Sequence, residues 1–325
     1  MGLMVDGKWT TDWYQPDSKG RFKRPQTKFH HQVTADGSSG FKAESGRYHL
    51  YVSHACPWAH RTMIMRKLKK LEDVISVSVV DPLMADDGWQ FSDYPGAITD
   101  IVNECRYLHE IYSMADRQYS GRVTVPVLWD KQNKTIVNNE SREIMRMLDT
   151  EFDAFGDSSV TFYAESLREK IDETITANYE TINNGVYRTG FATTQSAYDE
   201  ALLQLFDALD RCNEILAKQR YLCGDLITEA DWCLFTTLIR FDVVYVGHFK
   251  CNLRRIVDYP NIWNYVKELY QVAGIAETCN FDHIKNHYYQ SHTGINPTRI
   301  VAGGPLIDFF EPHDRDRLPL QTAAA

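Results

Sequence analysis

One stretch of 24 residues, Tyr48 to Leu71, constrains this chain more than any other: YHLYVSHACPWAHRTMIMRKLKKL. It begins with apolar residues at every second position, which is the pattern of a β-strand. The alternation ends before Cys56, and from Pro57 onward the apolar residues recur at helical spacing. Proline is favoured at the first helical position, because the N–H that it lacks is one that the helix could not pair. We therefore expect a strand, then Cys56, then a helix that begins at Pro57.

This position predicts a reactive thiol at Cys56. The start of a helix presents unpaired backbone N–H groups and the positive end of the helix dipole, and both favour a thiolate. Such surroundings can lower the pKa of a cysteine from about 8.5 toward roughly 3.5–7.5. The alternative is a small buried cysteine, because free cysteines are among the most buried residues. The succession of strand, Cys-Pro and helix favours the reactive thiol.

Cys56 has no local partner with which to form a disulfide. A dithiol site would need a second cysteine at position 59, where the chain has Ala59. A group transferred to the sulfur of Cys56 must therefore be removed by a second, diffusing thiol, for which glutathione is the obvious candidate. Activation of glutathione by serine or tyrosine would need a hydroxyl where this chain has a thiol. The site is thus expected to transfer thiols or remove glutathione rather than conjugate it.

Composition indicates a globular protein with room for two domains in 325 residues. The formal net charge is −9 and no long basic run occurs, so nucleic acid is not an expected partner. No apolar run is long enough to cross a membrane, and the amino terminus does not resemble a secretory signal. The seven cysteines form an odd set without a CxxC pair, which fits neither a disulfide scaffold nor a zinc ribbon. We expect a cytoplasmic protein without a membrane partner.

Residues 46–152 are expected to form a thioredoxin-like α/β domain. Their order of elements is β-α-β-α-β-β-α, and the crossover between the first two strands implies a parallel pair. After the first strand and helix, the expected elements are a strand over 75–80, a loop over 81–96, a helix over 99–114, strands over 122–130 and 135–137, and a helix from 139–141 to about 150.

The rest of the chain divides into an extension and a helical domain. Residues 1–45 are polar but carry several aromatic side chains, so we expect an extension packed on the body of the protein. Residues 153–325 show helical periodicity from Thr161, followed by an irregular tail, and predict an all-α domain. Within it, Thr228 and Asp231 have the spacing of a helix capping box.

Several motifs together resemble a known family. Cys56–Pro57–Trp58–Ala59 after a strand resembles the monothiol site of the glutaredoxin-like and omega-like glutathione transferases. Three further segments narrow the resemblance to the glutathionyl-hydroquinone reductases, or xi-class glutathione transferases: GRFKRPQTKFHH in the extension, Asn184–Ala192, and Lys285–His292 followed by Ile295–Pro297. The resemblance covers nearly the whole chain, although His30 replaces a usual arginine and the tail from Leu306 has no clear family pattern. It implies glutathione transferase architecture, with a thioredoxin-like domain before a helical one.

The resemblance also implies where glutathione binds. In thioredoxin-like folds the bond equivalent to Val125–Pro126 is cis, and Val125 would hold the cysteinyl backbone of glutathione. On its own Val-Pro is weak evidence, since only about 5–6% of such bonds are cis. Glu140 and Ser141 open a helix, whose free N–H groups can bind a carboxylate. Ser141 can add a hydroxyl and Glu140 can accept from the α-ammonium, but a plain helix cap is the alternative. By resemblance, Arg122 would bind a ligand carboxylate and Trp89 would form an apolar wall.

For the second substrate, the resemblance assigns two phenols. Tyr187 and Tyr288 would lie over the sulfur-bearing ring, bind its hydroxyls and help to deliver the proton to the leaving carbon. Ordinary packing is the alternative for two of eighteen tyrosines. His283 and His287 have the i, i+4 spacing of a zinc site, but no HExxH glutamate or nearby cysteine accompanies them, so we expect no metal.

The expected activity is the glutathione-dependent reduction of glutathionyl-hydroquinones, through a mixed disulfide of Cys56 with glutathione. Glutathione is the co-substrate and a glutathionylated aromatic compound is the second substrate. Two alternatives remain: an omega-like thiol transferase that reduces dehydroascorbate or mixed disulfides, and a transferase-like interaction module without turnover. Members of the family are generally dimers, so a homodimer is expected.

Overall fold

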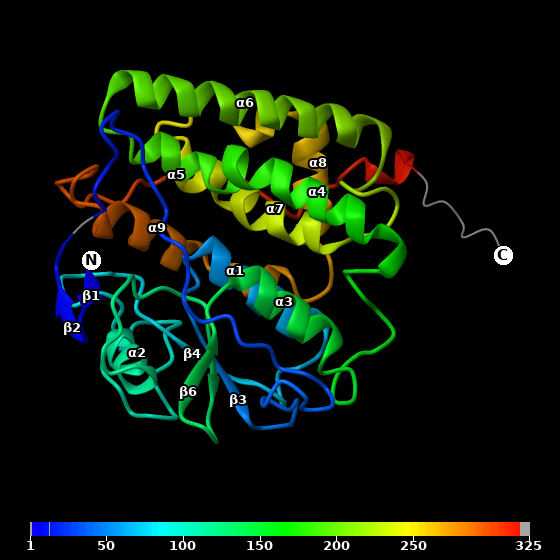
Figure 1. The fold of residues 1–325 in the computed structure, drawn as a ribbon. Coiled ribbons are helices and arrows are strands. Elements are labelled where there is room, and N and C mark those ends of the chain that lie inside the picture. Colours follow the sequence, from blue (N-terminus) through cyan, green and yellow to red (C-terminus); the bar gives the residue numbers. More distant parts are fainter. Residues whose placement is uncertain (1, 13, 319–325) are drawn as a thin grey trace. The chain divides into compact units, whose positions relative to one another are not determined.

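The computed structural model describes residues 2–12 and 14–318 of the chain (Figure 1). Contacts within the chain group it into two units. The first unit comprises Met1–Tyr14, Arg24–Val160 and Thr278–Ala302, and the second comprises Gln15–Lys23, Thr161–Glu277 and Gly303–Ala325. Each unit is therefore assembled from pieces that are far apart in the sequence. The domains expected over 1–45, 46–152 and 153–325 stay a prediction.

A four-stranded mixed sheet forms the centre of the first unit. Its strands are β3 (Tyr48–Val52), β4 (Ser76–Val79), β5 (Val127–Asp130) and β6 (Thr135–Asn138), in the order β4-β3-β5-β6. β3 pairs with β4 in parallel and with β5 antiparallel, and β5 pairs antiparallel with β6. All five residues of β3 are buried, as expected for the central part of a sheet covered on both faces.

The helices of the first unit are α1 (Pro57–Leu68), α2 (Leu108–Ala115), α3 (Ser141–Thr150) and α9 (Phe281–Ser291). From β3 to α3 the elements follow one another as β-α-β-α-β-β-α, so the predicted order of a thioredoxin-like domain is confirmed. α1 packs beside α3 (Figure 1). α9 belongs to this unit although it follows the helical part of the chain.

Two predicted elements are shorter than the sequence indicated. The helix expected over 99–114 begins only at Leu108, because the buried carboxylate of Asp100 accepts backbone N–H bonds from Val102, Asn103 and Cys105. These bonds hold the preceding segment in turns, in competition with a helix. The strand expected over 122–130 begins at Val127, directly after a proline that has no N–H to pair.

The extension contributes a hairpin that the sequence did not reveal. β1 (Leu3–Val5) and β2 (Lys8–Thr10) pair antiparallel. Further along, residues 29–31 run beside β6: the N–H of His31 donates to the carbonyl of Val137 at 3.0 Å. Both segments therefore add backbone pairs to the first unit.

The second unit is helical. Its α-helices are α4 (Arg168–Asn178), α5 (Gly185–Gly190), α6 (Gln195–Lys218), α7 (Glu229–Arg240) and α8 (Pro260–Tyr270). Two π-helical turns are η2 (Tyr179–Asn183) and η3 (Phe241–Tyr245), and short 3₁₀ turns are η1 (Glu165–Leu167), η4 (Ile256–Asp258) and η6 (Arg315–Arg317). A further 3₁₀ turn, η5 (Ala276–Thr278), spans the point in the sequence where the chain passes back to the first unit. The predicted capping box is confirmed at the start of α7, where the N–H of Thr228 donates to Asp231 Oδ2 at 2.8 Å. Within the described residues, no helix combines the length and apolarity that crossing a membrane requires.

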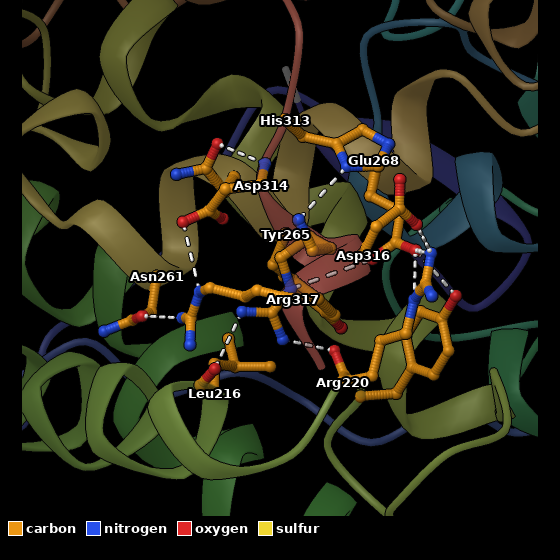
Figure 2. Close-up of polar contacts among 12 residues, drawn as sticks. Leu216, Arg220, Asn261, Tyr265, Glu268, His313, Asp314, Asp316 and Arg317 are labelled. Carbon is orange, nitrogen blue, oxygen red and sulfur yellow. Dashed lines mark hydrogen bonds and ion pairs between the residues drawn. The ribbon is translucent and has the colours of Figure 1, made fainter. Parts of the chain in front are cut away.

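A buried arginine anchors the carboxy-terminal segment to the end of α6. Arg315 has no exposed surface, and its guanidinium donates to the carbonyls of Leu216 at 2.7 Å and Gln219 at 2.9 Å, and also to that of Arg220. Leu216 lies in the last turn of α6, where a helix leaves its carbonyls unpaired, and Gln219 and Arg220 follow the helix directly. Around them, the side chain of Arg220 pairs with Glu268 at 2.6 Å and with Asp316 at 2.8 Å (Figure 2).

This arrangement predicts that two arginines of the η6 turn contribute very differently to the free energy of unfolding. Arg315→Ala should lower the free energy of unfolding by about 2–4 kcal/mol, because it removes a buried side chain and its charged hydrogen bonds to one buried and two partly buried carbonyls. Arg317 is a matched control: its side chain is 41% exposed and bonds Asp314 and Asn261 at the surface (Figure 2). Arg317→Ala should cost about 1 kcal/mol or less. Urea unfolding followed by circular dichroism measures both, and equal losses would contradict the anchor.

Candidate functional site

Cys56 lies where the sequence placed it, at the start of α1. It is the N-cap residue, with extended backbone (φ −80°, ψ 121°), and Pro57 is the first helical residue. The side chain is half-buried, and its Sγ lies 3.6 Å from the carbonyl oxygen of Val125. A sulfur at a helix N-terminus faces the positive end of the dipole, which stabilises negative charge on it.

The segment opposite the sulfur has the predicted cis bond. The peptide between Val125 and Pro126 is cis. Val125 is only 4% exposed, and the next residue after the proline begins β5. The chain from β3 and the chain into β5 therefore meet at the Cys56 sulfur.

A second helix start lies in the same unit. Glu140 is the N-cap of α3, and its carboxylate accepts from the backbone N–H of Arg142 at 3.4 Å. The hydroxyl of Thr27, in the extension, donates to the other carboxylate oxygen at 3.4 Å. Ser141 is buried, and its Oγ accepts from the guanidinium of Arg61 on α1 at 3.4 Å. The carboxylate of Glu140 thus caps α3 in this structure, through the contact at 3.4 Å with the N–H of Arg142.

Trp89 lies in the expected loop but is buried. Its side chain is 5% exposed and stacks on the imidazole of His287 from α9, with 4.8 Å between ring centroids and 22° between planes. Its carbonyl accepts from the N–H of Leu108 at 2.9 Å. Trp89 and His287 therefore form a buried aromatic pair, although His287 lies nearly 200 positions later in the chain.

Arg122 is held by the amino-terminal segment. Its Nη1 donates to the backbone carbonyls of Gly2 at 3.0 Å and Asp12 at 2.8 Å. Its guanidinium carbon lies 4.0 Å from the centroid of the Tyr14 ring, the geometry of a cation–π contact. The sequence did not indicate these partners.

The two tyrosines fall in different units. Tyr288 lies on α9 in the first unit, 1% exposed, with ring contacts to His287 and His292. Tyr187 lies on α5 in the second unit, within an aromatic cluster that includes Phe249. The first unit thus contains Cys56, Trp89, Arg122, Val125, Glu140, Ser141 and Tyr288, and Tyr187 alone of the predicted site residues belongs to the second.

The seven cysteines, all within the described residues, form no disulfide. Burial, with nearby Asp100, raises the pKa of the Cys105 thiol to about 12. Burial likewise raises the pKa of Cys212 to about 12 and raises the pKa values of Cys223 and Cys251. These four thiols are poor nucleophiles near neutral pH, in contrast to a sulfur at a helix start.

The two histidines with zinc-like spacing bind backbone carbonyls. The rings of His283 and His287 lie 2.8 and 2.9 Å from the carbonyl oxygens of Pro95 and Pro82. In the described part of the chain, no group of three or more His, Cys, Asp or Glu is placed to hold a metal ion. The sequence did not indicate that His287 stacks on Trp89; its only signal was the position of His287 directly before Tyr288.

Comparison with known proteins shows which family has this sequence and fold. The family models described as the N-terminal and C-terminal domains of glutathione S-transferase match residues 55–151 and 195–268. The chain is 55% identical to the glutathionyl-hydroquinone reductase YqjG of Escherichia coli K12, over 97% of this chain and 99% of that one. The structure of a xi-class transferase from Natrialba magadii superposes with a TM-score of 0.93 at 55% identity, covering 98% and 97% of the two chains.

The glutathione-bound structure of E. coli YqjG superposes with a TM-score of 0.89 at 53% identity, over 97% of this chain and 99% of that one. Both the sequence relatives and the solved structures thus cover nearly the full length. The chain belongs to the glutathionyl-hydroquinone reductases, the xi class of the glutathione transferase superfamily.

Proposed function

We propose that this protein uses glutathione to reduce glutathionyl-hydroquinones, and that Cys56 is its nucleophile. The observation that supports this most directly is the half-buried sulfur at the start of α1, 3.6 Å from the carbonyl that precedes the cis proline. Membership of the reductase family supplies the substrate class. The co-substrate is glutathione, and the enzyme is proposed to be a cytoplasmic homodimer.

The reaction consists of two displacements at sulfur, of which only the second is a thiol–disulfide exchange. The Cys56 thiolate attacks the glutathione sulfur of the aryl thioether, forming a sulfur–sulfur bond while the carbon–sulfur bond breaks. The electron pair of the broken bond passes to the aromatic carbon, which takes a proton and leaves as the hydroquinone. The thiolate of a second glutathione then attacks the mixed disulfide, which releases glutathione disulfide and restores the Cys56 thiolate.

The remaining site residues are proposed to bind and orient. Val125 would pair its backbone with the cysteinyl part of glutathione, and Glu140 with Ser141 would bind the γ-glutamyl end at the start of α3. Trp89 would form an apolar wall and Arg122 would bind a carboxylate. Nη1 of Arg122 already donates to two carbonyls, so a ligand carboxylate would use its other N–H groups.

Tyr288 and Tyr187 are proposed to act on the aromatic substrate. Their phenols would bind the hydroxyl groups of the ring and assist proton delivery to the carbon that loses sulfur. This assignment rests on the family resemblance of the segments that carry them. It also separates the proposed reaction from simple thiol transfer, which needs no proton at carbon.

Replacement of the nucleophile tests the central step. Cys56→Ser should reduce turnover of a glutathionylated hydroquinone by roughly three orders of magnitude or more, because a hydroxyl cannot form the mixed disulfide. Glutathione binding, measured by calorimetry, should persist. Cys105→Ser is the matched control, since Cys105 is also half-buried, and it should keep wild-type turnover. Substantial turnover in Cys56→Ser would remove this residue from the role.

The double variant Tyr187→Phe with Tyr288→Phe separates the proposed activity from that of an omega-like thiol transferase. Turnover of the glutathionylated hydroquinone should fall by about 10²-fold, the contribution of one general acid–base group. Reduction of a small mixed disulfide should stay within a few-fold of wild type, because it requires no phenol. Equal losses in both assays would argue against a role for these phenols in proton delivery. If the wild-type protein produces no glutathione disulfide, it is an interaction module without turnover.

Thiol labelling tests which sulfur is reactive without requiring turnover. Iodoacetamide at neutral pH should alkylate Cys56 at least about tenfold faster than Cys105, Cys212, Cys223 or Cys251, since the pKa values of those four thiols are raised. Peptide mass spectrometry gives the rate at each site, and glutathione should protect Cys56. Labelling of Cys105 at the same rate as Cys56 would contradict the assignment.

A further inference from the structure

The amino-terminal hairpin contacts the loop that carries Trp89. Trp9, on β2, donates its indole N–H to the carbonyl oxygen of Asp86 at 2.9 Å. The same indole stacks on the ring of His109, the second residue of α2, with 4.9 Å between centroids and 22° between planes. Trp9 therefore joins the loop to the helix that follows it.

The contact continues to the residue directly before Trp89. Gly88 has a positive φ of 77°, and a Cβ placed there would lie 2.7 Å from the Trp9 ring. Only a residue without a side chain fits between this backbone and the indole. The Trp9 ring therefore lies directly against the backbone that precedes Trp89.

The opposite support of the loop comes from α9. His287 stacks on Trp89, and its Nδ1 lies 2.9 Å from the carbonyl oxygen of Pro82. The hydroxyl of Ser291 accepts the N–H of Met84 at 2.9 Å. In the segment that precedes Trp89, α9 thus contacts Pro82 and Met84, and Trp9 contacts Asp86 and Gly88.

The same hairpin also holds the segment of Arg122. Met4 exchanges two backbone hydrogen bonds with Gly121, each of 2.9 Å. The carbonyls of Gly2 and Asp12, on either side of the hairpin, accept from the Arg122 guanidinium. One small element thereby touches the surroundings of two of the proposed glutathione-binding side chains.

We propose that the β1–β2 hairpin positions the glutathione site, with Trp9 as the positioning residue for the Trp89 loop and the flanking carbonyls as the support of Arg122. Trp9 acts through these two residues and is not itself a ligand of the substrate. The inference rests on the proposed function, since it assigns Trp89 and Arg122 to glutathione. It gives the extension of this chain a role in co-substrate affinity rather than in chemistry.

Two substitutions of Trp9 in the full-length protein test the proposal. Trp9→Ala removes the indole, whereas Trp9→Phe keeps an aromatic ring but loses the N–H donated to Asp86. Trp9→Ala should raise the Kd for glutathione, measured by calorimetry, and its KM about tenfold, and Trp9→Phe should raise them by a smaller factor. The kcat at saturating glutathione should stay within about twofold, because the hairpin makes no contact with the reacting atoms.

Trp263→Phe, on α8 of the second unit, is the matched control for loss of an indole and should leave the Kd unchanged. Glutathione affinity within twofold of wild type in both Trp9 variants would overturn the proposal. So would a fall in kcat with unchanged KM, which would indicate general damage. The Kd comparison is independent of turnover: if wild-type protein binds glutathione but does not reduce glutathionyl-hydroquinones, the proposed function fails while the positioning role is still decided.

Discussion

The whole first unit depends on one constraint, the exit of a buried strand directly into a helix through a cysteine. β3 is buried along its length, so the chain leaves the sheet at a fixed point, and Pro57 starts α1 within a few residues. The Cys56 sulfur consequently lies beside the helix N-terminus, where negative charge is favoured. The entry to β5 brings the carbonyl of Val125 to 3.6 Å from the same sulfur. The backbone therefore fixes the position of this sulfur.

Features set by local sequence could be predicted. The Cys-Pro helix start, the turn into α3 and the Thr228–Asp231 capping box each depend on residues only a few positions apart, and all three are present. The start of α2 could not be predicted, because the Asp100 side chain takes N–H groups that a helix would have paired. The hairpin β1–β2 gave no signal either, since strands of three residues show little alternation and are stabilised by distant contacts.

The same contrast between local and distant determinants applies to the predicted site residues. Resemblance to a family pointed to Trp89 and Arg122, but not to the groups that surround them. Trp89 rests on His287, and Arg122 donates to carbonyls near the amino terminus. These partners are about 200 and 110–120 residues away along the chain, and no pattern within one segment encodes such a pairing. The sequence therefore indicated candidate binding side chains, but not the distant groups that contact them.

The grouping of α9 with the first unit has a consequence for how such a protein could be divided. The helix that supports Trp89 is encoded after the helical unit, whereas residues 303–318 return to that unit and are anchored there by Arg315. A fragment that stops at Val160 would carry the thiol and the sheet yet lack the imidazole that stacks on Trp89. Chimeras between relatives would accordingly need to exchange the late helix together with the early domain, as a matched pair.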